Sequence, residues 1–329
     1  MTLLQIIGIV VILSGVTVAL FLLILYLHFR SEIPEAYRRV SEKTSRIIGT
    51  RYGPVEFISY GQGHPVIFVH GIWGGFDQGL VGAQGISEEK YRLIIPSRFG
   101  YLRTPLPDQA SAALQADQYA ALLDAMNIRK AVIVGTSAGG TSAGGTSAVQ
   151  FAIRHPHRCS ALILKSTNVP ENQPAPSGAG RVMMNILVTS DFFLWLLMRC
   201  SPSTMMSIAG IPGNLQKTIT QEQREWYAAF CQTFLPTVPR SKGILFDAYI
   251  SNPEIDTVPF ETITVPTLIF HAKDDPLPPY ASADKMAGRI ADAVFVGYEH
   301  GGHLLLGHDD DTRKKMDQFI ADCIAITTG

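Results

Sequence analysis

The stretch Val132-Ile133-Val134-Gly135-Thr136-Ser137 is an apolar run that ends in a serine preceded two positions earlier by glycine. The segment GTSAG at residues 135–139 is repeated at once at residues 140–144, and an incomplete third copy, GTSAV, follows at residues 145–149. The apolar run predicts a buried strand, and residues 149–154 have a helical pattern that stops before Pro156. The local structure is therefore a strand, a glycine-flanked serine and a helix, with one motif present more than once.

Further apolar runs alternate with helical patterns along most of the chain. Strands are expected at residues 55–60, 65–69, 93–96, 131–134, 161–164, 267–270 and 294–296, and helices at residues 112–126, 149–154 and 312–324. This alternation predicts a mostly parallel sheet with helices on both faces, which is an α/β fold. The strand pattern is interrupted at residues 168–262, where prolines and large apolar residues are frequent, so a helical cap is expected there.

Composition excludes several classes of function. The chain has 329 residues and a formal net charge of −1, which gives no basic footprint for nucleic acid. No cofactor or metal is implied, because the glycine-rich segment lacks the lysine of a phosphate-binding loop and the cysteines have no metal-ligand spacing. Free thiols are expected at all four cysteines, which are Cys159, Cys200, Cys231 and Cys323.

The N-terminal segment is strongly apolar. Residues 1–29 contain no Asp, Glu, Lys or Arg, and residues 3–27 are long enough to cross a bilayer core, which takes about 20 helical residues. No basic residue precedes this run, so an uncleaved anchor over residues 1–29 is favoured over a signal peptide. Residues 30–51 are expected to form a juxtamembrane helix or linker. The basic residues that follow the run are Arg30, Arg38, Arg39, Lys43 and Arg46, and they predict that the domain faces the cytoplasm.

Four motifs in order resemble the α/β-hydrolase superfamily. They are the oxyanion-loop-like His70-Gly71-Ile72-Trp73-Gly74-Gly75, the G-x-S-x-G repeat, the acid turn Phe270-His271-Ala272-Lys273-Asp274-Asp275, and Gly301-Gly302-His303 after the last strand. The resemblance implies a hydrolase core at residues 52–167 and 263–329 with the cap at residues 168–262. It also implies a nucleophilic serine, His303 as its base and Asp275 as the acid, with Asp274 as the alternative; His70 is expected to be structural.

The repeat leaves the nucleophile open between two serines. Members of the family place the serine directly after the strand, which fits Ser137, and about fourteen residues before the helix-ending proline, which fits Ser142. Ser137 is favoured, because the junction with the strand fixes the nucleophile against the histidine. The resemblance assigns the oxyanion donors to the backbone N–H of Ile72 and of the residue after the nucleophile, which is Ala138 for Ser137 and Ala143 for Ser142.

The resulting functional hypothesis is a membrane-anchored serine hydrolase that cleaves an ester or related acyl bond of a hydrophobic small molecule through an acyl-enzyme. Two alternatives stay open within the family, a carbon–carbon bond hydrolase and a cofactor-free perhydrolase. A third alternative is a non-catalytic binding protein that the duplication has disabled. The expected partners are the substrate and the lipid bilayer.

Overall fold

An eight-stranded sheet runs through the domain in the order β1-β2-β4-β3-β5-β6-β7-β8. The computed structural model describes residues 2–41, 43–137, 143–167, 169–170 and 175–328. β1 and β2 are antiparallel to their neighbours, and the strands from β4 to β8 are parallel. The strands are β1 (Arg46–Thr50), β2 (Gly53–Gly61), β3 (His64–Val69), β4 (Tyr91–Pro96), β5 (Ala131–Thr136), β6 (Cys159–Lys165), β7 (Thr267–Ala272) and β8 (Val294–Tyr298).

Helices cover both faces of the sheet, because successive residues of each central strand point to opposite sides. Ile67 and Ile133 pack with α3 (Ala112–Ala125), α4 (Ala143–Arg154) and α11 (Tyr280–Ala287) in one apolar cluster. Alternate residues of the same strands pack with α2 (Phe76–Gly82) and α12 (Asp309–Thr328) in another cluster. The mostly parallel sheet with helices on both faces confirms the predicted fold class.

A helical cap follows β6 and precedes β7. Its own apolar cluster includes Ile72 and Trp73 from the loop after β3, so the cap and the sheet edge share one core. The cap elements are α5 (Gly178–Thr189), α6 (Asp191–Cys200), α7 (Pro202–Ile208), α8 (Gly213–Gln216), α9 (Gln221–Gln232), η1 (Val238–Arg240), α10 (Ser241–Phe246), η2 (Asp247–Ser251), η3 (Pro253–Thr257) and η4 (Phe260–Thr262).

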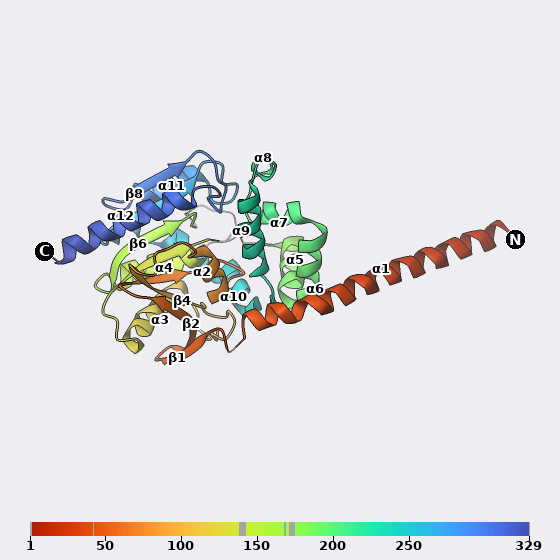
Figure 1. The fold of residues 1–329 in the computed structure, drawn as a ribbon, viewed down its shortest axis with the longest axis horizontal. Helices are drawn as coiled ribbons and strands as arrows, with labels where there is room; N and C mark the ends of the chain where they lie inside the picture. The colour runs from red at the N-terminus through yellow and green to blue at the C-terminus, as the bar shows by residue number, and fades with distance from the viewer. Residues whose placement is uncertain (1, 42, 138–142, 168, 171–174, 329) are drawn as a thin grey trace.

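The N-terminal helix α1 runs without interruption from Leu3 to Arg39 and projects far from the domain (Figure 1). Thr2 caps it through a reciprocal pair of hydrogen bonds with Gln5. Its outer part is exposed, and among the described residues it is the one single helix long and apolar enough to cross a membrane.

The boundaries at the start of the domain differ from the expected ones in detail. Residues 30–39, expected within a linker, complete α1, and Arg46–Thr50 forms edge strand β1 paired with β2. The run of residues 46–50 is short and contains Gly49, so its sequence does not indicate a strand. The sheet therefore begins before the expected core boundary at residue 52.

Candidate active site

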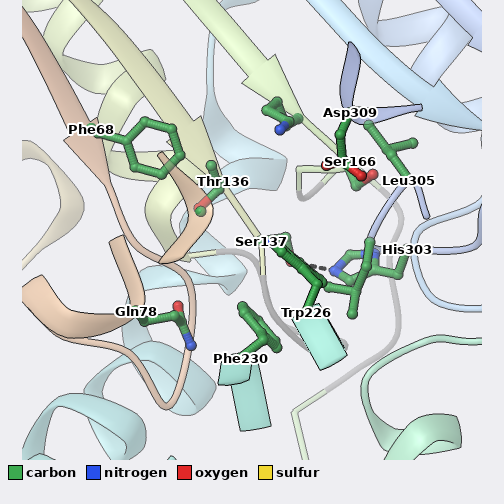
Figure 2. A pocket seen from close by; sticks show the side chains of 13 residues that line it. Phe68, Gln78, Thr136, Ser137, Ser166, Trp226, Phe230, His303, Leu305 and Asp309 are labelled. Atoms are coloured by element: carbon green, nitrogen blue, oxygen red, sulfur yellow. Dashed lines mark hydrogen bonds between the residues drawn. The ribbon is translucent and has the colours of Figure 1, made fainter. Parts of the chain in front are cut away.

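Ser137, His303 and Asp275 form one hydrogen-bonded chain. The three residues follow β5, β8 and β7, so the carboxyl ends of parallel strands bring them to the same edge of the sheet. The Ser137 Oγ lies 2.6 Å from His303 Nε2, and His303 Nδ1 lies 2.8 Å from Asp275 Oδ2. All three side chains are buried, and Figure 2 shows Ser137 and His303 pointing toward each other across the pocket. This is the arrangement that lets a histidine accept a serine proton.

The two neighbouring carboxylates have different partners. Asp275 also accepts a hydrogen bond of 2.9 Å from the Leu277 N–H, which fixes its orientation toward His303. Asp274 instead accepts from the Gly302 N–H at 2.8 Å, so it supports the backbone of the loop that carries the histidine. The geometry therefore associates Asp275 with the imidazole and leaves Asp274 a supporting position.

The five surplus residues of the repeat lie between Ser137 and the first residue of α4. The described part of helix α4 begins at Ala143. Ala138 and Ser142, which are an expected oxyanion donor and the alternative nucleophile, lie outside the described residues. Six described non-glycine residues have positive φ, and Ser137 is not among them. The φ of Ser137 therefore lies outside the left-handed region.

Two glycines allow the end of β5 and the start of α4 to pack closely, and they come from different copies of the repeat. A Cβ on Gly135, two residues before Ser137, would lie 2.8 Å from the Ala148 Cβ and 3.0 Å from the Gly145 Cα. A Cβ on Gly144 would clash with the carbonyl oxygens of Thr136 and His70. The first copy thus supplies the strand end with its serine, and the second supplies the start of the helix beside it.

The loop after β3 is held by buried hydrogen bonds. Gln78 Oε1 accepts from the Gly71 N–H at 3.0 Å, and Gln78 Nε2 donates to the Ile72 carbonyl at 3.2 Å. Within the described residues, no hydrogen bond occupies the Ile72 N–H. The loop held by Gln78 therefore keeps one backbone donor without a partner among the described residues.

His70 has a structural position. Its Nε2 accepts from the Arg98 N–H at 3.0 Å, so Nδ1 carries the proton and donates to the Gly71 carbonyl at 2.7 Å. Burial, followed by the nearby Arg98 charge, holds the pKa of His70 well below its ordinary value. Arg98 is itself buried in an ion pair with Asp247. His271, beside the acid, likewise has its pKa lowered by burial, and it hydrogen-bonds the Pro278 carbonyl at 2.9 Å.

Two cap residues contact the site and were missed in the sequence. The Gly210 carbonyl accepts a 2.9 Å hydrogen bond from the His303 N–H, and a Cβ on Gly210, whose φ is +75°, would clash with the His303 Cβ. The buried Arg240 donates to the Gly74 carbonyl and pairs with Asp77 at 2.8 Å. Both contacts join residues far apart in the chain, so no local pattern signals them.

The pocket at Ser137 has a mixed lining, in which apolar side chains of the sheet edge and the cap stand beside polar ones such as Gln78, Ser166 and Asp309. Trp226 and Phe230 of α9 approach Ser137 from the cap side, and Phe68 lies on the sheet side (Figure 2). Lys165 also lines the pocket, and burial lowers its pKa. A second pocket lies between Trp73 and the cap helices, and its lining is entirely apolar: Trp73, Leu187, Leu194, Leu197, Met205, Ile208 and Phe234. The second pocket suits a hydrophobic ligand.

No group of His, Cys, Asp and Glu side chains in the described part of the chain has the arrangement of a metal site. The four cysteines are free thiols, of which Cys200 alone is exposed.

Comparison with known proteins places this site in context. A model of the alpha/beta hydrolase family matches residues 66–314. A 2-hydroxymuconate semialdehyde hydrolase of Pseudomonas putida is 27% identical over 271 residues, which cover 81% of this chain and 90% of the relative. The structure of an alpha/beta hydrolase fold protein from Nakamurella multipartita has a TM-score of 0.68 at 24% identity, over 84% of this chain and 98% of that one.

A second similar structure matches nearly the whole chain. It is a membrane phospholipase A, with a TM-score of 0.57 at 18% identity over 97% of this chain and 98% of that one. Since α1 has 37 of the 329 residues, a match of this extent includes most of α1. The likeness shows a shared fold over nearly the whole of this chain.

Proposed function

This chain belongs to the alpha/beta hydrolase family and is a hydrolase, and from that premise we propose that it cleaves an ester or related acyl bond of a hydrophobic small molecule. The observation that carries the proposal is the hydrogen-bonded chain Ser137–His303–Asp275 beside a pocket into which the cap brings the apolar side chains of Trp226 and Phe230. Ser137 is the nucleophile in this account, because its hydroxyl meets the histidine directly after β5.

The proposed reaction has two stages. The Ser137 Oγ attacks the acyl carbon while its proton passes to His303 Nε2, and Asp275 stabilises the imidazolium. The leaving alcohol takes that proton, and an acyl-enzyme remains. Water activated by His303 then attacks the acyl carbon and releases the acid, which restores Ser137.

The developing oxyanion needs two backbone donors. We assign the Ile72 N–H and, in place of Ala138, the Ala143 N–H. The first N–H groups of a helix have no partner within it, and Ala143 begins α4. Its neighbour Gly144 lies against the carbonyls of Thr136 and His70, which brings the helix start beside both the strand end and the oxyanion loop.

A panel of p-nitrophenyl esters of increasing chain length tests the leading proposal. We expect turnover that rises from the acetyl ester to a medium-chain ester and that is lost in Ser137→Ala. Folded protein that hydrolyses none of the esters would contradict the ester proposal.

A carbon–carbon bond hydrolase is the second candidate, favoured by the relative named 2-hydroxymuconate semialdehyde hydrolase. That compound contains no ester, so its hydrolysis must break a carbon–carbon bond. Loss of the visible absorbance of 2-hydroxymuconate semialdehyde, with no turnover of esters, would favour this candidate. Failure of both assays and of labelling by a fluorophosphonate would favour a non-catalytic binding protein.

We also propose that α1 anchors the enzyme in a membrane with the domain on the cytoplasmic side. Its support is the uncharged run of residues 3–27 followed by basic residues. A reporter fused after Gly329 that is active only after export should stay inactive, and its activity would contradict this orientation.

A further inference from the structure

The inner part of α1 is attached to the cap by an aromatic cluster. Phe29 of α1 lies 5.4 Å from the Phe192 ring and 5.8 Å from the Trp195 ring, measured between centroids. The Tyr26 ring lies 5.9 Å from the Phe192 ring, and the Phe193 ring lies 5.7 Å from Phe192 in a tilted arrangement. Helix α6 therefore meets α1 at the end of the apolar run.

Polar contacts hold the same junction in place. Glu32 accepts hydrogen bonds of 2.8 Å from Trp195 Nε1 and of 2.8 Å from Arg199. Tyr37 donates to Asp191 at 2.8 Å. Because these contacts lie on successive turns of α1, the cap has a defined orientation relative to the helix axis.

The length of the apolar run sets the level of the membrane surface at this junction. Residues 3–27 span roughly 37 Å as a helix, against a hydrocarbon core of about 30 Å. With this run in the core, Tyr26 and Phe29 lie at the boundary with the headgroups, where aromatic side chains are enriched. Phe192 and Phe193, at the start of α6, then lie at the same level.

Exposed apolar side chains continue from this junction over the cap. Val182 and Met183 of α5 are 59% and 55% exposed, and Phe193 of α6 is 48% exposed. Ile186 of α5 and Ile208 of α7 are exposed as well. Figure 1 shows α5, α6 and α7 together on the side of the domain from which α1 leaves. We call these five side chains the cap patch.

Helices α5 and α6 also have the composition of membrane-embedded helices. Taken as a pair they are long and apolar enough to pass for one broken span, with a bend of 105° between them. Val188, Leu194 and Trp195 are buried, so one face of the pair packs into the cap. The opposite face carries most of the cap patch, which is typical of helices that lie within a membrane surface rather than cross it.

We propose that the cap patch is a second membrane-docking surface, which inserts into the headgroup–acyl boundary of the bilayer that holds α1. The occupant is lipid, because the patch is continuous with the aromatic cluster at the end of the apolar run. An apolar patch of this kind would promote aggregation if it were exposed to water, and burial in lipid removes that exposure. Docking fixes the cap against the bilayer and leaves the sheet on its far side.

If the proposed hydrolytic function holds, docking also defines the source of the substrate. The apolar pocket behind the patch contains Leu187, Met205 and Ile208, and it reaches Trp73 beside the oxyanion loop. Ile208 belongs to both the pocket and the patch. The substrate class that fits this path is an acyl compound dissolved in the bilayer.

Fluorescence quenching in vesicles tests the docking without any substrate, so its failure is distinct from a failure of the proposed activity. The full chain with Cys200→Ser, which removes the exposed thiol, carries an environment-sensitive NBD label at Val182→Cys or at Phe193→Cys. Val294→Cys is the matched control, because Val294 is 46% exposed on β8, far from α1 in Figure 1. Val11→Cys within α1 reports the bilayer core.

In phosphatidylcholine–phosphatidylglycerol vesicles, we expect lipids with a nitroxide on the acyl chain to reduce emission from residues 11, 182 and 193. Aqueous iodide should quench the label at residue 294 only. Iodide quenching at residues 182 and 193 equal to that at 294 would overturn the proposal, as would an unquenched label at residue 11. Labels shielded from both quenchers, with the shielding lost on dilution into excess lipid, would also overturn it, since a second copy of the chain would then cover the patch.

Discussion

Deletion of one copy of the repeat tests most directly how Ser137 is connected to helix α4. Because the copies are identical, deletion of residues 138–142 leaves Gly-Thr-Ser-Ala-Gly-Gly-Thr-Ser-Ala-Val. Ser137 would then be followed directly by the residue that is now Ala143, the first residue of α4. In the contracted chain, Ser137 lies both directly after the strand and about fourteen residues before the helix-ending proline. In the natural chain, Ser137 has the first of these spacings and Ser142 has the second.

Two opposing effects set the stability of the contracted protein. Joining fixed ends through five residues costs about 1.4 kcal/mol of chain entropy, which the deletion removes. A tight elbow places Ser137 in a strained backbone state that costs about 1–3 kcal/mol. We therefore expect the free energy of unfolding to change by between about +0.4 and about −1.6 kcal/mol, which leaves the protein folded.

The rate of acylation by a fluorophosphonate is the decisive readout. Gly144 already lies against Thr136 and His70, so the helix start is in place and both assigned oxyanion donors persist. We expect the rate to stay within about tenfold of the natural chain, since loss of one donor would cost about 10²–10³. The control is the same deletion with Ser137→Ala, which should not label. A contracted protein that unfolds cooperatively but no longer labels would refute the idea that the first copy supplies the serine and the second copy supplies the start of the helix.

Three further predictions concern the surroundings of the site. Gly210→Ala should displace His303 and slow fluorophosphonate labelling about 10²-fold, whereas Gly213→Ala in the same cap, which meets no atom within 4 Å, should label normally. Arg240→Met should lower the free energy of unfolding by about 3–5 kcal/mol in a denaturant titration, because a buried carboxylate loses its partner. Burial lowers the pKa of His70, so below about pH 6.5 the unfolded chain takes up a proton that the folded chain does not. The free energy of unfolding should therefore decrease by up to about 1.4 kcal/mol for each pH unit below that value. Thermal midpoints measured against pH should show this decrease, and the slope should be smaller in His70→Gln.

The sequence predicts the sheet well because its strands are short apolar runs with clear boundaries. The expected strand at residues 131–134 corresponds to β5 (Ala131–Thr136), and the expected helix at residues 112–126 corresponds to α3 (Ala112–Ala125). The order of the motifs also places Ser137, Asp275 and His303 at one sheet edge, where the structure brings them into contact.

The repeat itself marks the limit of sequence reasoning at the site. Identical copies carry identical local preferences, so only tertiary contacts distinguish them. The hydrogen bond of Ser137 to His303 selects the first copy, and the contact of Gly144 with His70 selects the second for the helix start. Arg240 escaped notice for a similar reason, because its partner Asp77 lies 163 residues away.

The central claim is that Ser137 is the nucleophile of a working hydrolase, and active-site labelling tests it most directly. The full chain reacts with a fluorophosphonate, and mass spectrometry of the peptide that spans residues 131–154 measures the covalent adduct in the natural protein, in Ser137→Ala and in Ser142→Ala. We predict an adduct in the natural protein and in Ser142→Ala, and none in Ser137→Ala. An adduct that persists in Ser137→Ala and disappears in Ser142→Ala would contradict the account.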